Sequence, residues 1–319
     1  MLDQFGRNID YLRIAVTDRC NFRCRYCMPT AGIPLMERKE ILHYGEIADL
    51  VKKVMLPLGI AKVRLTGGEP LIRKDIVRLV ERLSDLPDLS LTTNGSLLEE
   101  LALPLKKAGL RRVNVSIDSL DRERFSFLTR GGELEKVLRG IDAALAAGLD
   151  PVKINVVLIP GVNGGDWMDF ARLTLEKRVH VRFIEFMPLG DPQYYADRSF
   201  LPLAEIKGKI EDSFGLEEAV ISGNGPAKIF MIPGALGTIG LIDPMSHAFC
   251  GKCNRLRLTA DGKLKPCLMH AEEVDLKTPF REGASPSELQ ELVREVLAKK
   301  PIGYPETIEQ ARSMSQIGG

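Results

Sequence analysis

The sequence contains no long apolar run and almost no net charge. Its 319 residues include 44 Lys and Arg against 43 Asp and Glu, so no overall field attracts nucleic acid or an anionic membrane surface. The opening residues, MLDQFGRNIDYLRIAV, carry scattered charges in place of the apolar segment of a signal peptide, and no run reaches the ~20 apolar residues that cross a bilayer. We therefore expect a cytoplasmic protein that binds neither membranes nor nucleic acid.

Cysteine is scarce and unevenly placed. The chain has 6 cysteines in 319 residues, too few for a disulfide framework in a reducing compartment. They fall into two triplets, C-x3-C-x2-C and C-x2-C-x13-C, formed by Cys20, Cys24 and Cys27 and by Cys250, Cys253 and Cys267. Such clusters indicate metal binding or redox chemistry.

Neither triplet has a fourth cysteine. A structural zinc site usually has four protein ligands, and His43, the histidine nearest to the first triplet, is expected to be an ordinary surface residue. A 4Fe-4S cluster needs a ligand for each of four irons, so three cysteines leave one iron open to another molecule. At the second triplet, a zinc site completed by His247 or His270 remains an alternative.

Short β-branched segments alternate with longer helical patterns in the first part of the chain. This repeat predicts βα units with strands at Leu12–Thr17, Lys62–Thr66, Leu89–Thr93, Arg112–Ile117, Val152–Ile159 and Val179–Phe186. Spacing alone fits a doubly wound sheet or a barrel lacking two units. Polar segments follow nearly every strand (DRCNFRC, TGGEP, TTNG, SIDS, EFMP), which favours the shared mouth of an incomplete (β/α)6 TIM-like barrel.

The character of the chain changes near residue 195. A helix is expected over Leu203–Phe214, followed by the short strands KIFMIP, TIGLI and RLRLT, and a last helix over Ser285–Lys300 with Ser285 as its N-cap. We predict two domains, a partial barrel (1–195) and a C-terminal domain (196–319) that forms a mixed extension closing the open side of the barrel.

Basic residues occur inside the expected strands. Arg13, Arg64, Lys153 and Arg182 belong to four of them, and the period-two spacing of Arg255 and Arg257 places both on one strand face. Several buried cations are costly without a partner. Because arginine suits forked contacts with phosphate, they indicate a small phosphorylated substrate.

The first triplet and its surroundings resemble the radical S-adenosylmethionine (radical SAM) superfamily. C-x3-C-x2-C with Tyr26 before the last cysteine, and TGGEP after the second strand, are similar to its motifs. The likeness implies a cluster whose open iron binds S-adenosylmethionine and a reaction begun by a 5′-deoxyadenosyl radical.

Within that superfamily the sequence resembles the GTP 3′,8-cyclase family, which performs the first step of molybdenum cofactor biosynthesis. The segments that carry the likeness span nearly the whole chain: LRIAVTDRCNFRCRYCMP, VRLTGGEPLIRKD, LTTNG, VNVSIDSL, VKINVVL, RFIEFMP, CGKCNRLRLT and the ending SQIGG. They imply two 4Fe-4S clusters, S-adenosylmethionine as cofactor and GTP as the substrate, cyclised from ribose C3′ to guanine C8.

Site residues follow from this resemblance at the matching positions. It implies that Tyr26, Gly68, Ser116 and Met187 contact S-adenosylmethionine, while Asn94, Asp118 and Arg182 support the site. Substrate contacts are implied for Arg13, Arg64, Thr92, Lys153, Arg255, Leu256 and Arg257. Catalytic roles are implied for Arg13, Arg255, Arg257, Gly318 and Gly319, although composition alone reads the two terminal glycines as a flexible tail.

Two rival functions remain open. A radical SAM enzyme with an auxiliary cluster could modify a peptide, and a zinc or nucleic-acid-binding protein could also place basic residues near cysteines. For the cyclase we expect an external electron donor and transient contact with the pyranopterin synthase that uses the product. The sequence leaves a homodimer open.

Overall fold

The centre of the molecule is one large sheet. A computed structural model describes residues 1–189, 194, 200–220, 225–304 and 312–318, and within them twelve strands follow the order β12-β11-β10-β1-β2-β3-β4-β5-β6-β9-β8-β7. All six expected strands are present, each with ends within two residues of the expected ones: β1 (Tyr11–Ala15), β2 (Lys62–Thr66), β3 (Asp88–Thr93), β4 (Arg112–Ser116), β5 (Val152–Leu158) and β6 (His180–Glu185).

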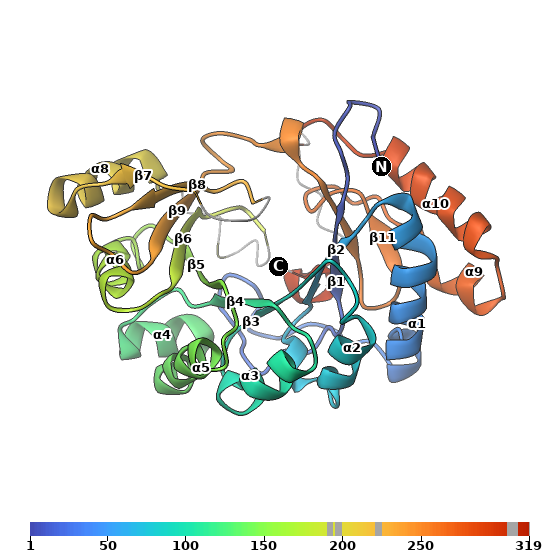
Figure 1. The fold of residues 1–319 in the computed structure, drawn as a ribbon, viewed down its shortest axis with the longest axis horizontal. Helices are drawn as coiled ribbons and strands as arrows, with labels where there is room; N and C mark the ends of the chain where they lie inside the picture. The colour runs from blue at the N-terminus through green and yellow to red at the C-terminus, as the bar shows by residue number, and fades with distance from the viewer. Residues whose placement is uncertain (190–193, 195–199, 221–224, 305–311, 319) are drawn as a thin grey trace.

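These six strands lie side by side in chain order and run parallel. A doubly wound sheet would reverse its order at a switch point, so the barrel alternative is the correct one. In the described residues the outer strands β12 (Val274–Asp275) and β7 (Glu217–Glu218) are not bonded to each other. The fold is therefore an incomplete TIM-like barrel, visible in Figure 1 as strands that curve around a central space.

Helices cover the outer side of the barrel (Figure 1). They are α1 (Tyr44–Asp49), α2 (Ile76–Arg82), α3 (Leu98–Lys107), α4 (Arg122–Thr129), α5 (Leu134–Ala146) and α6 (Trp167–Glu176). The first continues as a π-helical turn, Leu50–Met55, and a 3-10 turn, Leu56–Leu58, that ends at Gly59 with φ +84°. Glycine adopts this left-handed conformation without a steric penalty, which explains the stop.

Side chains alternate between two environments along each parallel strand. Leu12 and Ile14 of β1 are completely buried in the hydrophobic core beneath the helices, while Arg13 between them lines the central cavity. Alternation of this kind is the ordinary geometry of a strand. It places the apolar face of the sheet outward and its polar face inward.

The C-terminal region adds strands to both edges of the barrel. Strands β9 (Thr238–Ile242) and β10 (Arg255–Leu258) pair in parallel with β6 and β1. The antiparallel strands β8 (Lys228–Met231) and β11 (Lys263–Lys265) lie outside them. The extension is mixed, as expected. The division at residue 195 stays a prediction, because the second segment is bonded to both edges of the first.

The other α-helices in the described ranges are α8 (Leu203–Phe214), α9 (Lys277–Arg281), α10 (Pro286–Ala298) and α11 (Met314–Ile317). The expected N-cap of α10 is present: Ser285 Oγ accepts a hydrogen bond from Glu288 N, and the Glu288 carboxylate accepts one from Ser285 N. Helix α11 turns inward, and Figure 1 places the end of the chain in the central space. Among the described helices, none is long and apolar enough to cross a membrane.

Candidate functional site

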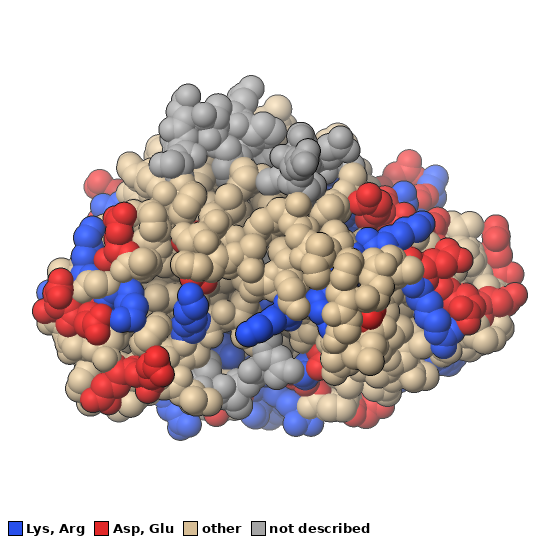
Figure 2. All heavy atoms as spheres, turned by 90° about the horizontal axis from the view of Figure 1, so that it is seen from above, with Lys and Arg blue, Asp and Glu red and all other residues tan. Residues whose placement is uncertain are grey.

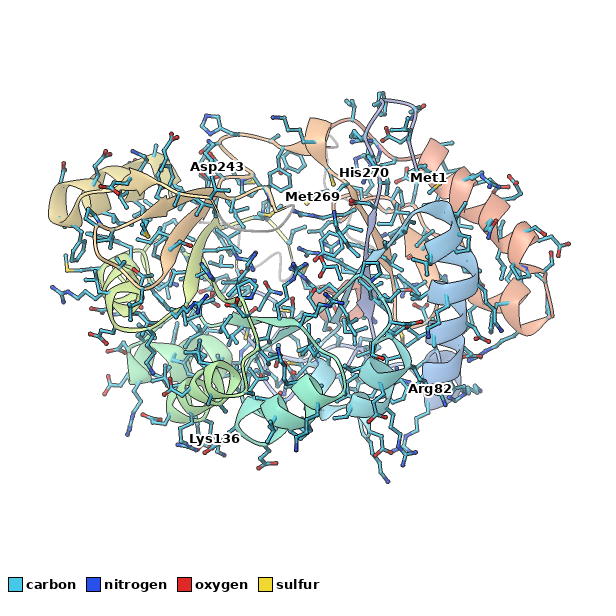
Figure 3. The ribbon with its side chains drawn as sticks, viewed as in Figure 1. Met1, Arg82, Lys136, Asp243, Met269 and His270 are labelled. Atoms are coloured by element: carbon cyan, nitrogen blue, oxygen red, sulfur yellow. The ribbon has the colours of Figure 1, made fainter. Side chains whose placement is uncertain are left out.

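A large cavity lies inside the barrel. Its volume is about 400 Å³, and all six cysteines line it. Figure 3 shows Met269, which also lines the cavity, toward the central space, whereas Arg82 and Lys136 lie at the outer rim. The cavity brings together residues from the first and last parts of the sequence.

The first triplet lies on one loop after β1. The peptide N–H groups of Arg23 and Arg25 donate to the carbonyls of Thr129 and Leu128 at the end of α4, and Cys27 N donates to Cys24 O within the loop. Burial raises the pKa of Cys20 to about 11 and that of Cys27 to about 12, and it raises the pKa of Cys24 as well. A bound metal ion would take the place of these protons.

Gly67 and Gly68 lie directly against the first triplet's loop. Gly68 N donates to Thr17 O at 2.8 Å, and Glu69 N donates to Arg19 O at 2.8 Å. A Cβ on Gly68 would stand 2.1 Å from Arg19 O, and one on Gly67 would stand 2.4 Å from Thr17 O. Glycine is therefore required at both positions because this segment packs closely against the backbone of Thr17 and Arg19. The sequence did not reveal this contact.

Two buried carboxylates fix neighbouring segments. Glu69 accepts from Leu71 N, Thr93 Oγ1 and Asn94 N at 2.6–2.9 Å. Asp118 accepts from Tyr26 Oη at 2.6 Å and from Val157 N at 2.8 Å. Burial raises the pKa of Glu69 to about 7 and that of Asp118 to about 6. Asp118 thus has a place near the cofactor residues that it was expected to support. Glu69 was not predicted, although its position directly after the glycine pair could have marked it.

The other residues implied for the cofactor lie on the first triplet's loop (Tyr26) or at the ends of barrel strands. Tyr26, Gly68, Ser116 and Met187 all line the cavity. Asn94 also lines it, and its side-chain amide donates to Asn21 Oδ1 at 2.8 Å. The structure thus brings these residues into the same cavity as the first triplet.

Six cations line the cavity without a carboxylate partner among the described residues. They are Arg13, Arg64, Lys153, Arg182, Arg255 and Arg257. The register places Arg13 opposite both Arg64 and Arg257, so the charges are neighbours on one face. The outer surface differs, because cationic and anionic side chains are interspersed at both sides of the view from above (Figure 2).

These cations carry the electrostatic cost of burial and mutual repulsion. Burial, followed by the charges of Arg182, Arg112 and Arg64, lowers the pKa of Lys153 to about 7. Burial likewise lowers the pKa of Arg64 to about 10 and that of Arg255 to about 10. An anion in the cavity would relieve both costs.

Several buried polar atoms around the cations have no hydrogen-bond partner in the described residues. They include Tyr11 Oη, Thr92 Oγ1, Asn155 Oδ1 and the Nε atoms of Arg13, Arg182 and Arg255. Buried polar groups are normally satisfied, and clustered exceptions indicate a missing polar partner. The cavity is suited to a polar, anionic molecule.

The second triplet combines two segments of chain. Cys250 begins a 3-10 turn (Cys250–Lys252) after β9, Cys253 follows that turn directly, and Cys267 follows β11. Lys300 Nζ lies 3.7 Å from Cys253 Sγ and donates to Arg255 O and Pro266 O. Burial acts to raise the pKa of Cys253, but the charges of Lys300 and Arg255 outweigh it and the pKa is lowered.

The histidines considered for a zinc site have other partners. His247 Nδ1 lies 2.8 Å from Asp243 Oδ2, and His270 Nε2 lies 3.3 Å from Gly303 O. In the part of the chain that the structure describes, no three His, Cys, Asp or Glu side chains are arranged to hold a single metal ion. A four-iron cluster does not need such an arrangement, because each ligand binds its own iron.

The end of the chain reaches the arginines. Gly318, at φ +75°, accepts a hydrogen bond through its carbonyl from Arg257 Nη1. A Cβ on Gly318 would stand 2.4 Å from Thr66 Cγ2, so only glycine fits here. Gly319 lies outside the described residues. Leu256 points away from the cavity into the hydrophobic core, so any contact with a ligand there would have to come from its backbone.

Sequence reasoning missed two residues that hold the second triplet, Arg7 and Lys300. Arg7 is buried, and its Nη1 donates to Cys250 O at 2.8 Å and to Pro301 O at 2.9 Å. Lys300 is 2% exposed. Both act over long sequence separations with no local motif to mark them.

Known proteins resemble the chain over its full length. A model of the radical SAM superfamily matches residues 14–174, and a Molybdenum Cofactor Synthesis C model matches residues 179–305. A curated GTP 3′,8-cyclase of Gloeobacter violaceus is 51% identical over 322 residues, covering 98% of this chain and 99% of the relative. Another from Moorella thermoacetica is 50% identical over 325 residues, covering 100% of both chains.

A solved structure shares the fold. Streptococcus suis SuiB bound to S-adenosylmethionine aligns with a TM-score of 0.61 at 13% identity, covering 95% of this chain and 77% of SuiB. Identity this low supports the fold alone, whereas half identity over the whole length supports the family. The chain belongs to the GTP 3′,8-cyclase family of the radical SAM superfamily.

Proposed function

We propose that this chain cyclises GTP to (8S)-3′,8-cyclo-7,8-dihydroguanosine 5′-triphosphate, the first step of molybdenum cofactor biosynthesis. Its curated relatives named GTP 3′,8-cyclase are about half identical to it from end to end. The structural observation that carries the proposal is one cavity in which cations without carboxylate partners lie together with two cysteine triplets. A nucleoside triphosphate supplies the negative charge that such a cavity requires.

Membership of the radical SAM superfamily brings a 4Fe-4S cluster and S-adenosylmethionine. The first triplet fits the cluster because its three free thiols share one loop and line the cavity. When bound, these groups supply a 5′-deoxyadenosyl radical that removes the hydrogen of ribose C3′. Tyr26, Gly68, Ser116 and Met187 would then hold S-adenosylmethionine, with Asp118 fixing the Tyr26 hydroxyl.

The second triplet would hold another 4Fe-4S cluster, whose open iron would take the guanine end of GTP. Three free thiols line the cavity there too, and Lys300 supplies a positive charge beside Cys253. Zinc is the alternative at this triplet. Metal and sulfide analysis distinguishes the two.

The cations between the triplets would hold the triphosphate. Arg64 of β2 and Lys153 of β5 both line the cavity, and Thr92 Oγ1 of β3, between them in the sheet, is a buried hydroxyl without a partner in the described residues. Arg13, Arg255, Arg257 and the backbone at Leu256 would complete the contacts. Holding both ends of GTP places C3′ and C8 for reaction, an effect of proximity and orientation.

The terminal glycines would act at the same place. Arg257 already binds the Gly318 carbonyl, so this contact would position the arginine beside the substrate. Gly318, Gly319, Arg13, Arg255 and Arg257 are our proposed catalytic residues.

Anaerobic reconstitution tests this function directly. The full chain should take up about eight irons and eight sulfides, four of each per cluster. With reductant and S-adenosylmethionine, GTP should be consumed as the cyclised nucleotide and 5′-deoxyadenosine appear. Stable GTP in the presence of active S-adenosylmethionine cleavage would contradict the substrate assignment.

The rival functions give other results in the same assays. Modification of a peptide with GTP untouched would favour a peptide-modifying enzyme. A colourless protein with bound zinc and salt-dependent nucleic-acid binding would favour the nonenzymatic alternative. An external electron donor, contact with the pyranopterin synthase, a homodimer and cytoplasmic localisation remain predictions.

A further inference from the structure

Lys300 is a lysine buried beside the second triplet. It follows the end of α10 and is 2% exposed, whereas its neighbour Lys299 is exposed. The Lys300 ammonium donates to Arg255 O at 2.8 Å and to Pro266 O at 2.7 Å, and lies 3.7 Å from Cys253 Sγ. An ammonium has three N–H donors, and each of them has an acceptor here.

The charge of Lys300 has no carboxylate partner in the described part of the chain. Burying an ammonium costs several kcal/mol, on the order of the whole stability of a domain, unless an anion or good hydrogen bonds compensate it. The two carbonyls are neutral. The remaining contact, Cys253 Sγ, becomes anionic when it binds a metal.

Arg7 provides a contrast on the other side of the same segments. Its Nε forms an ion pair with Asp3 Oδ2 at 2.5 Å, so its charge is neutralised within the N-terminal segment. Its other nitrogens bind Cys250 O, Pro301 O and Lys300 O. Arg7 therefore fixes the backbone that carries Lys300. Lys300 itself brings a charge without a carboxylate partner to Cys253, where Arg255 and Arg257 add to the positive charge.

The contacts of Lys300 also join separate parts of the triplet. Arg255 O belongs to the strand after Cys253, and Pro266 O belongs to the residue before Cys267. One ammonium thus bridges both cysteine-bearing segments. Loss of that bridge would let Cys267 move relative to Cys253.

We propose that Lys300 is a positioning residue for the second cluster, holding Cys253 and Cys267 in register and stabilising the cluster's reduced state through its positive charge. This inference rests on the proposed function, because it requires iron at the second triplet. A four-iron cluster with three thiolates is negatively charged and becomes more so on reduction. A nearby cation therefore favours the reduced form and raises the reduction potential.

The test uses the full-length chain with Cys20, Cys24 and Cys27 replaced by Ala, so that iron can assemble only at the second triplet. In this background we compare Lys300→Met, Lys300→Arg and the exposed control Lys299→Met. Iron and sulfide content and an anaerobic redox titration followed by electron paramagnetic resonance are measured. Circular dichroism verifies that each protein is folded.

We expect Lys300→Met to retain the fold but to lower the second cluster's potential, reducing the ratio of reduced to oxidised cluster at least tenfold, which is 59 mV for one electron. Lys300→Arg should stay near the parent because it keeps the charge, and Lys299→Met should match the parent. An unchanged potential in folded Lys300→Met would overturn the proposal for Lys300 alone. If the parent with the three Ala replacements binds no iron, the proposal of a second cluster is wrong as well. GTP turnover by the chain with all six cysteines tests the proposed activity separately.

Discussion

The two cysteine triplets have the same number of ligands but are built differently. The first lies on one loop held by backbone contacts to the end of α4, and the buried carboxyl groups of Asp118 and Glu69 lie nearby. The second combines two segments bridged by Lys300, whose own backbone is held by Arg7. The first site is thus defined by local sequence, whereas the second requires long-range folding and is surrounded by positive charge.

The difference indicates that the two triplets have different roles. Burial and the neighbouring carboxyl groups raise the pKa of the thiols in the first triplet, so added negative charge is disfavoured there. Cations around the second triplet favour anionic ligands, including the substrate we propose. The following predictions test this division, beginning with the largest expected effect.

Removing one cysteine from each triplet should separate the two roles. Cys24→Ala should abolish both 5′-deoxyadenosine formation and GTP consumption, because S-adenosylmethionine loses its iron site. Cys253→Ala should abolish GTP cyclisation but retain some 5′-deoxyadenosine formation. Each variant should hold about four irons in place of about eight. Identical behaviour of the two variants would remove the proposed division.

Arg64→Met should affect the substrate without affecting either cluster. Loss of a buried contact with phosphate costs about 2–4 kcal/mol, roughly 30- to 700-fold in the dissociation constant for GTP. The same change removes a buried, repelled charge, so the iron-free protein should unfold at a higher temperature. Calorimetric GTP binding and thermal unfolding measure the two effects. A parallel loss of iron would assign Arg64 to cluster assembly instead.

Lys153 should make GTP binding depend on pH. Its pKa of about 7 lies below the ordinary 10.5, so the empty site loses this proton as the pH rises through 7. GTP binding then requires proton uptake, and affinity should fall by up to about tenfold per pH unit above pH 7. Lys153→Arg should abolish this dependence because the guanidinium stays charged. Titrations at pH 7.5 to 9 in two buffers of different ionisation enthalpy measure the uptake.

The stability of the GTP-free protein should rise with pH, whereas its affinity for GTP should fall. Between about pH 7 and 10.5 the unfolded chain holds more protons at Lys153 than the folded chain does. Lys153 therefore contributes a rise in the free energy of unfolding with pH across this window. Urea unfolding of the parent and of Lys153→Arg should differ in slope there, and parallel curves would contradict the lowered pKa.

The smallest effect should come from the N-cap of α10, the helix that leads to Lys300. Ser285→Ala removes a capping hydrogen bond worth about 1 kcal/mol. Ser213→Ala is the matched control, because Ser213 Oγ donates to Lys209 O within a helix and caps nothing. It should change unfolding by less than about 0.5 kcal/mol. A loss of iron on Ser285→Ala confined to the second triplet would strengthen the link between α10 and that site.

The sequence was most informative where a pattern is local. Strand periodicity located all six barrel strands, and the spacing of Cys20, Cys24 and Cys27 identified the first triplet with its surroundings. The alternation that places Arg255 and Arg257 on one face was also visible, and the structure puts both in the cavity. The family resemblance supplied the substrate, which periodicity could not.

Other features depend on contacts between distant residues. Nothing near Lys300 in the sequence marks it as buried, because its acceptors are at Cys253, Arg255 and Pro266. Gly68 must be glycine because its loop packs against the backbone of Arg19. Arg19 lies nearly fifty positions earlier in the sequence. The joining of 196–319 to both sheet edges likewise follows from pairing that no local propensity encodes.

The pairing of β1 with β10 also sets the order in which the molecule can be completed. Tyr11 lies opposite Arg255 in that pairing. The edge of β1 that pairs with β10 therefore stays unpaired during synthesis until Arg255 has left the ribosome. Pairing over so long a separation is slow to form. Gly318 lies later still in the chain, and its carbonyl accepts a hydrogen bond from Arg257. A chain that stops before Gly318 would keep its sheet and both triplets, yet Arg257 would lose the carbonyl that it binds inside the cavity.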